Sequence, residues 1–230
     1  NLLNGLIMVY YHAQGETPSW EIPELPEYSA KEWMPLRPAY YQKLHTHVQE
    51  LGEQFPDIAH IKFLHSDEFV KSNAPTIDGI VWSKFFWTKQ SFTTRGVGLK
   101  NGTQAVSNSQ IETQYEITFY GLGYNQQKYC TKAMFEFNFL VLALLTPIDK
   151  EYIDVRLVIS AKKLFNSFIT AALTSLILKV FKKEFEKDIP ILSEKLHHLH
   201  PILCEGDGEI MQYRRWASQF YSEEPATAKA

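Results

Sequence analysis

The chain has 230 residues, of which 45% are hydrophobic and 14% aromatic, and its formal net charge is -3. That length can bury one large core or two small ones. The slightly acidic balance provides no basic field for nucleic acid, so we expect no such partner. The two cysteines, Cys130 and Cys204, are far apart in the sequence, which predicts free thiols and a reducing, cytoplasmic setting.

The N-terminal segment begins with an apolar run, residues 2–11, that predicts a strand. The chain starts at asparagine and has no signal-peptide pattern, so we expect a further N-terminal part to be missing, and any membrane association to depend on that part. Residues 14–38 contain five prolines. This composition predicts an extended connector over a surface, anchored by Trp20 and Trp33.

The next segment, residues 45–65, has a helical pattern that Pro56 divides, and a new helix is expected to begin near Pro56–Asp57. Strands rich in β-branched and aromatic residues follow between residues 76 and 156, separated by turn clusters at 100–102 and 121–125. They are predicted at 79–82, 85–87, 91–99, 111–120, 129–143 and 153–159. Short strands joined by such turns indicate an antiparallel sheet.

A long amphipathic helix is predicted at residues 164–186. Its uncharged run, residues 165–178, is shorter than the ~20 residues of a membrane span, which favours a buried core helix. Pro190 should break the helix, leaving Asp188 at its end. The expected fold is therefore α+β, a curved antiparallel sheet around a long C-terminal helix.

The strongest chemical signal is the pair His60 and His65 with Asp57 three residues before the first histidine. Five residues turn a helix by ~140°, so both rings can reach one ion only if the helix ends or loosens between them. Asp57 could orient the ring of His60 as a supporting carboxylate. Two imidazoles with one carboxylate form the facial triad of non-haem Fe(II) oxygenases. From these residues alone, a chance spacing remains open, and Asp188 could be an ordinary solvated carboxylate.

A resemblance adds to these observations. Residues 57–65 look like the D-x-x-H-x-x-x-x-H iron motif of Rieske oxygenases. The nearest branch is that of 3-ketosteroid 9α-hydroxylase oxygenase components and Neverland-type cholesterol 7-desaturases. Other stretches resemble the same branch: residues 4–13, 18–20, 145–149, 187–191 and 207–221. Gln54 departs from the asparagine that this branch often has three residues before the aspartate.

The resemblance implies a helix-grip, START-like catalytic domain with His60, His65 and Asp188 as iron ligands. It implies that Asp57 bridges towards a Rieske-cluster histidine of a neighbouring subunit in a homotrimer. Electrons would come from NAD(P)H through a reductase or ferredoxin and a [2Fe-2S] Rieske cluster. Such a cluster needs two cysteines and two histidines in paired motifs, which this sequence lacks.

The resemblance also implies a division of the chain and a class of reaction. Residues 1–40 would be the end of a Rieske domain with its connector, 41–222 the iron domain, and 223–230 a disordered tail. The reaction would be hydroxylation or desaturation of a sterol or steroid. Two alternatives remain open: a lipid-binding START-like module without catalysis, and a monooxygenase for aromatic or chlorophyll-derived substrates. The histidine group 197–200 is expected to be a surface loop.

Overall fold

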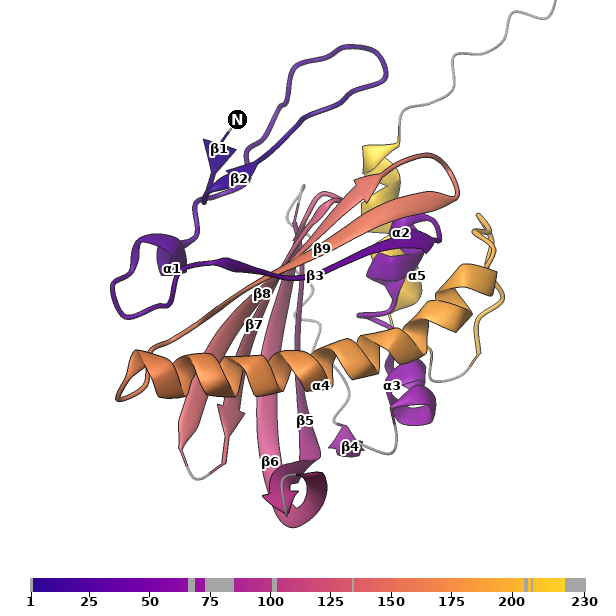
Figure 1. Ribbon diagram of the computed structural model, residues 1–230. Coiled ribbons are helices and arrows are strands. Elements are labelled where there is room, and N and C mark those ends of the chain that lie inside the picture. Colours follow the sequence, from indigo (N-terminus) through magenta and orange to yellow (C-terminus); the bar gives the residue numbers. More distant parts are fainter. Residues whose placement is uncertain are drawn as a thin grey trace, which may run out of the picture.

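Seven antiparallel strands form the main sheet of the computed structural model, which describes residues 2–65, 69–72, 85–100, 103–133, 135–204, 207 and 209–221 (Figure 1). Their spatial order is β3-β9-β8-β7-β6-β5-β4, so consecutive strands from β4 to β9 are neighbours and β3 pairs with the last. The bounds are β3 Arg37–His45, β4 Phe69–Ser72, β5 Phe85–Lys100, β6 Thr103–Tyr120, β7 Tyr124–Lys132, β8 Glu136–Pro147 and β9 Tyr152–Ala161.

Several predicted strand limits were wrong. Residues 85–87 and 91–99 belong to one strand, β5, because the polar residues between them keep their pairing, as Gln90 does opposite Tyr115. The predicted strand 129–143 is two strands, β7 and β8, which end at Lys132 and begin at Glu136 and pair antiparallel. Asn125, which the sequence placed in a turn, lies in β7. The predicted strand 79–82 lies outside the described residues.

The N-terminal segment is a small hairpin rather than one long strand. Strands β1 Leu2–Leu3 and β2 Leu6–Ile7 pair across Asn4 and Gly5. Both turn residues have positive φ, 52° and 74°, as tight hairpin turns require. The segment after the hairpin, up to β3, has little regular secondary structure besides the short helix α1 Pro26–Ser29. It contributes Leu25 and Trp33 to a cluster on the strand face that carries Leu140 and Leu142.

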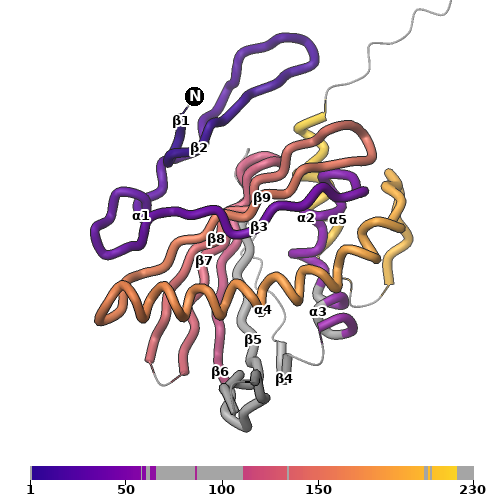
Figure 2. Tube along the Cα trace, in the orientation of Figure 1, coloured from indigo at the N-terminus to yellow at the C-terminus, as the bar shows by residue number. Residues whose placement is uncertain are grey.

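The long helix α4 Ser167–Glu194 lies across the other face of the sheet (Figure 2). The Asn166 side chain caps its start by accepting a hydrogen bond from the Ile169 N–H at 2.9 Å. The α+β class, with an antiparallel sheet and a long helix, is confirmed. The predicted break before Pro190 was wrong, since the helix continues to Glu194 with Pro190 inside it. Packing of the last turn, where Leu192 is buried in the core, offsets the hydrogen bond that proline removes.

The uncharged run of α4 is only partly buried. Phe165, which precedes the helix, is 95% exposed, and Phe168 in its first turn is 82% exposed. Leu173 and Ile177 further along pack against the core of the sheet, so the predicted buried helix is correct only for this later part. Among the described residues, no helix is long and apolar enough to cross a membrane.

Three short helices lie beside the C-terminal half of α4 (Figure 1). They are α2 Val48–Glu53, α3 Ile58–Leu64 and α5 Ile210–Ala217, which a 3-10 turn, Ser218–Phe220, extends. The predicted division at Pro56 is confirmed, with α3 beginning directly after Asp57. Helix α5 buries Tyr213 and Trp216 against Phe86 and Phe119 of the sheet. This packing fixes the end of the molecule that carries the candidate site.

Candidate metal centre

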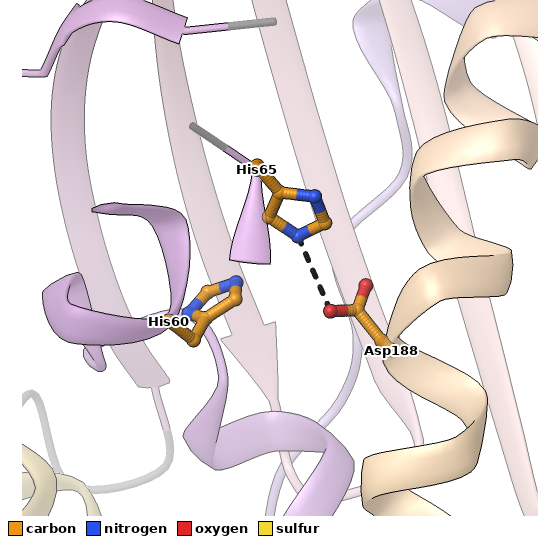
Figure 3. A group of neighbouring side chains, drawn as sticks. All are labelled: His60, His65 and Asp188. Atoms are coloured by element: carbon orange, nitrogen blue, oxygen red, sulfur yellow. Dashed lines mark ion pairs between the residues drawn. The ribbon is translucent and has the colours of Figure 1, made fainter. Parts of the chain in front are cut away.

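His60, His65 and Asp188 meet at one point between α3 and α4 (Figure 3). Each residue offers one ligand atom, and these atoms all lie within 4.8 Å of one another. Helix α3 ends at Leu64, directly before His65. The two side chains therefore need not point in different directions, as they would at this spacing in a continuous helix. Asp188 lies inside α4 rather than at its end. Its position on the buried face of that helix turns its carboxylate towards both rings.

The two imidazole rings are oriented by hydrogen bonds at their Nδ1 atoms. His60 Nδ1 lies 2.6 Å from the carbonyl oxygen of Asp57. His65 Nδ1 lies 2.9 Å from Glu184 Oε2, and its Nε2 lies 3.2 Å from Asp188 Oδ1. A metal-binding histidine almost always donates its second ring N–H to a carbonyl or carboxylate. Both rings have this arrangement, which leaves Nε2 of each as the ligand atom.

Asp57 supports the site differently from the sequence prediction. The expected carboxylate contact with the His60 ring is not formed, because the backbone carbonyl of Asp57 occupies that position. The carboxylate instead caps α3, accepting a hydrogen bond from the His60 backbone N–H at 3.2 Å. Asp57 therefore fixes both the start of the helix and the direction of its first histidine.

The charges around the site suit a cation. Burial lowers the pKa of His60, which favours the neutral imidazole that binds metals. Burial also acts against protonation of His65, but the carboxylates of Asp188 and Glu184 outweigh it and raise its pKa. The buried carboxylate of Asp188 and the partly buried carboxylate of Glu184 thus face one imidazole, and the Lys187 Nζ lies 2.9 Å from Glu184. A divalent ion would supply the positive charge that this donor set favours, and two imidazoles with one carboxylate fit Fe(II).

Glu184 is a site residue that the sequence analysis missed among the charges of the long helix. It lies four residues before Asp188, and residues at that spacing share one helical face. The spacing alone could have identified a pair of carboxylates. Its contact with His65 could not be predicted, because 119 residues separate the two in the chain.

A cavity of about 360 Å³ opens beside the three residues. Cavities that bind small ligands are typically ~300–1,000 Å³ and mostly apolar. This one lies between the sheet and α4, and its wall contains His60, His65 and Asp188. The apolar part of the wall includes Leu51, Phe55, Tyr115, Phe139, Leu145, Val155, Leu157, Leu176, Ile177, Val180, Phe181 and Phe185.

Comparison with solved structures shows the class of fold. A crystal structure of dicamba monooxygenase bound to 3,6-dichlorosalicylic acid superposes with a TM-score of 0.59 at 11% identity. The match covers 86% of this chain and 62% of that chain. The fold is that of the catalytic domain of Rieske oxygenases.

Comparison of sequences identifies the family. The model of the 3-ketosteroid 9α-hydroxylase C-terminal domain matches residues 9–221, and the chain belongs to this family. The cholesterol 7-desaturase of Xenopus laevis is 27% identical over 235 residues, covering 96% of this chain and 50% of that protein. The oxygenase component of 3-ketosteroid-9-alpha-monooxygenase from Rhodococcus rhodochrous is 24% identical over 231 residues, covering 95% of this chain and 55% of that protein. The chain thus spans about half the length of these relatives.

Proposed function

We propose that this chain binds mononuclear Fe(II) through His60, His65 and Asp188 and oxidises an unactivated C–H bond of a sterol or steroid. The observation that carries the proposal is the convergence of two imidazoles and one carboxylate on the wall of a largely apolar cavity. Bound iron would supply the activation of dioxygen. The relatives named for sterol and ketosteroid chemistry support the class of substrate.

The residues of the chain would contribute binding and orientation. The aromatic and aliphatic wall buries the rings of an apolar molecule at ~25 cal/mol per Å² and displaces water from the site. Glu184 and the Asp57 carbonyl keep the Nε2 atoms of His65 and His60 directed at the metal position. Asp188 is buried on α4, so a helix rather than a flexible loop fixes the position of its carboxylate.

The route of electrons belongs to the same proposal. A [2Fe-2S] Rieske cluster outside these 230 residues would deliver electrons that a reductase or ferredoxin takes from NAD(P)H. Asp57 would bridge to that cluster on the neighbouring subunit of a homotrimer. Its position supports this role, because its backbone carbonyl contacts the ring of one proposed ligand and its carboxylate begins the same helix.

The test is product formation by this chain supplied with a Rieske [2Fe-2S] protein, a reductase and NADH, with cholesterol or a 3-ketosteroid as substrate. Mass spectrometry separates the two outcomes, since desaturation removes two hydrogens and hydroxylation adds one oxygen. We expect product from the wild type and none from Asp188→Ala. The control is Glu186→Ala, an exposed carboxylate of the same helix, which should retain activity.

A lipid-binding module without catalysis predicts a different result. It would bind sterol equally in the wild type and in Asp188→Ala and give no product in either. Oxidation of aromatic acids without sterol turnover would retain the oxygenase assignment and refute the substrate.

A further inference from the structure

A buried amide in the cavity wall has no hydrogen-bond partner in the part of the chain that the structure describes. Asn125 lies in β7 between Phe119 of β6 and Ala143 of β8, and its side chain is 0% exposed. Neither Oδ1 nor Nδ2 has a partner within the described residues. An unpaired buried amide destabilises a fold, and most buried polar groups in proteins are paired. The amide is closed to bulk solvent and belongs to the wall of the cavity, so a ligand in the cavity is a source of the missing partner.

The neighbouring polar residues of the cavity wall are already paired. Alternate residues of β7 face the cavity, so Asn125 shares a row with Gln127, Tyr129 and Thr131. The Tyr129 hydroxyl donates to Gln127 Oε1 at 2.6 Å, and the hydroxyls of Thr131 and Thr113 lie 3.1 Å apart. Asn125 differs from the rest of this row because neither of its polar side-chain atoms has a hydrogen-bond partner among the described residues.

We propose that Asn125 is the hydrogen-bonding anchor for the oxygen function of an otherwise apolar ligand, a hydroxyl or ketone on a rigid hydrocarbon frame. A hydroxyl can donate to Oδ1 or accept from Nδ2, whereas a ketone can only accept from Nδ2. The identity of this ligand as the oxidised substrate rests on the proposed function; the binding step does not. Such pockets typically combine apolar walls with few polar groups that fix orientation.

The anchor would also determine which carbon reacts. Asn125 and the metal centre belong to the wall of the same cavity. A rigid molecule held at its oxygen by Asn125 presents a fixed set of carbons to the rest of the wall. Moving or removing the anchor should therefore change the position of attack as well as the affinity.

The test compares three ligands: cholesterol, the matching 3-ketone and the hydrocarbon that lacks the oxygen. Their affinities are measured by competition for the full chain, its Asn125→Leu variant and a Gln126→Leu control. Gln126 is the adjacent residue of β7, is buried and lies outside the cavity wall. The wild type and the control should bind an oxygenated ligand about tenfold more tightly than the hydrocarbon. Asn125→Leu should bind all three within about twofold, as expected when the hydrogen bond alone is removed.

Two outcomes would overturn the anchor: no preference for either oxygenated ligand in the wild type, or an undiminished preference in Asn125→Leu. Thermal unfolding provides a second measurement. Replacing an unpaired amide with leucine should raise the Tm of the ligand-free chain. If instead the Tm fell and the preference for oxygenated ligands were unchanged, Asn125 would stabilise the fold rather than bind a ligand. Iron content is measured in parallel. A wild type that binds sterol but no iron would contradict the proposed function and leave the anchor standing.

Discussion

Removal of Arg214 should expose how the helices beside the metal centre are held together. Arg214 of α5 is 8% exposed, and its Nε and second guanidinium nitrogen lie 2.6 and 2.9 Å from the two carboxylate oxygens of Glu53 in α2. The same guanidinium lies 3.2 Å from Glu50, which is 0% exposed. Arg214 is therefore the bidentate partner of the Glu53 carboxylate. It also contacts the Glu50 carboxylate, which Lys195 and His197 contact as well.

The expected magnitude follows from that burial. Arg214→Met keeps the apolar stem but leaves Glu53 without its bidentate partner. Removing one member of a buried ion pair typically destabilises a protein by about 3–5 kcal/mol. For a chain of this length, about 1 kcal/mol corresponds to roughly 2–4 °C in Tm, so the Tm should fall by roughly 6–20 °C.

Urea and thermal unfolding followed by circular dichroism measure the effect. The control is Arg215→Met, because Arg215 is the next residue of α5 and is exposed, and surface substitutions of this kind usually stay within about 0.5 kcal/mol. Arg214→Lys should fall between the two, since an ammonium keeps the charge but loses the bidentate geometry. A free energy of unfolding for Arg214→Met within about 1 kcal/mol of the wild type would refute the reasoning.

Three further predictions concern the same end of the molecule. Gly52→Ala should destabilise the chain by about 1–3 kcal/mol in urea unfolding, since its Cβ would lie 1.9 Å from the hydroxyl oxygen of buried Tyr213. Burial alone would raise the pKa of Glu50, but its cationic neighbours lower it below 4.5. The free energy of unfolding should therefore fall as the pH drops below 4.5, and this fall should be smaller in Glu50→Gln. Asp57→Asn keeps a capping oxygen for the His60 N–H, so iron binding and Tm should be retained while reductase-driven turnover is lost. If Asp57→Asn lost as much iron as His60→Ala, Asp57 would be a metal ligand instead.

The sequence predicted the sheet and the long helix of the fold better than the residues at which individual helices and strands begin and end. Pro56 correctly divided α2 from α3, because proline is disfavoured inside a helix and here lies between the two. The same reasoning was wrong at Pro190, where packing of Leu192 in the core holds the last turn of α4. Asn4 and Gly5 carried a hairpin signal, but the apolar residues around them outweighed it in the prediction of one strand.

The candidate site was predictable in its residue types but not in its contacts. The spacing of His60 and His65 required α3 to end between them, and the helix ends at Leu64. The partners of the rings, Glu184 and the Asp57 carbonyl, depend on tertiary placement that no local pattern encodes. Asn125 was assigned to a turn because asparagine is rare in strands. Its burial in β7 is itself the feature that points to a ligand.

Anaerobic titration of the chain with Fe(II) tests the central claim most directly. The wild type should bind one iron per chain, and alanine at His60, His65 or Asp188 should weaken binding by more than roughly 100-fold, beyond the effect expected of supporting residues. His198→Ala, an exposed member of the histidine group 197–200, should bind iron like the wild type. Retention of wild-type affinity in Asp188→Ala, or loss of it in His198→Ala alone, would contradict the assignment of the metal centre.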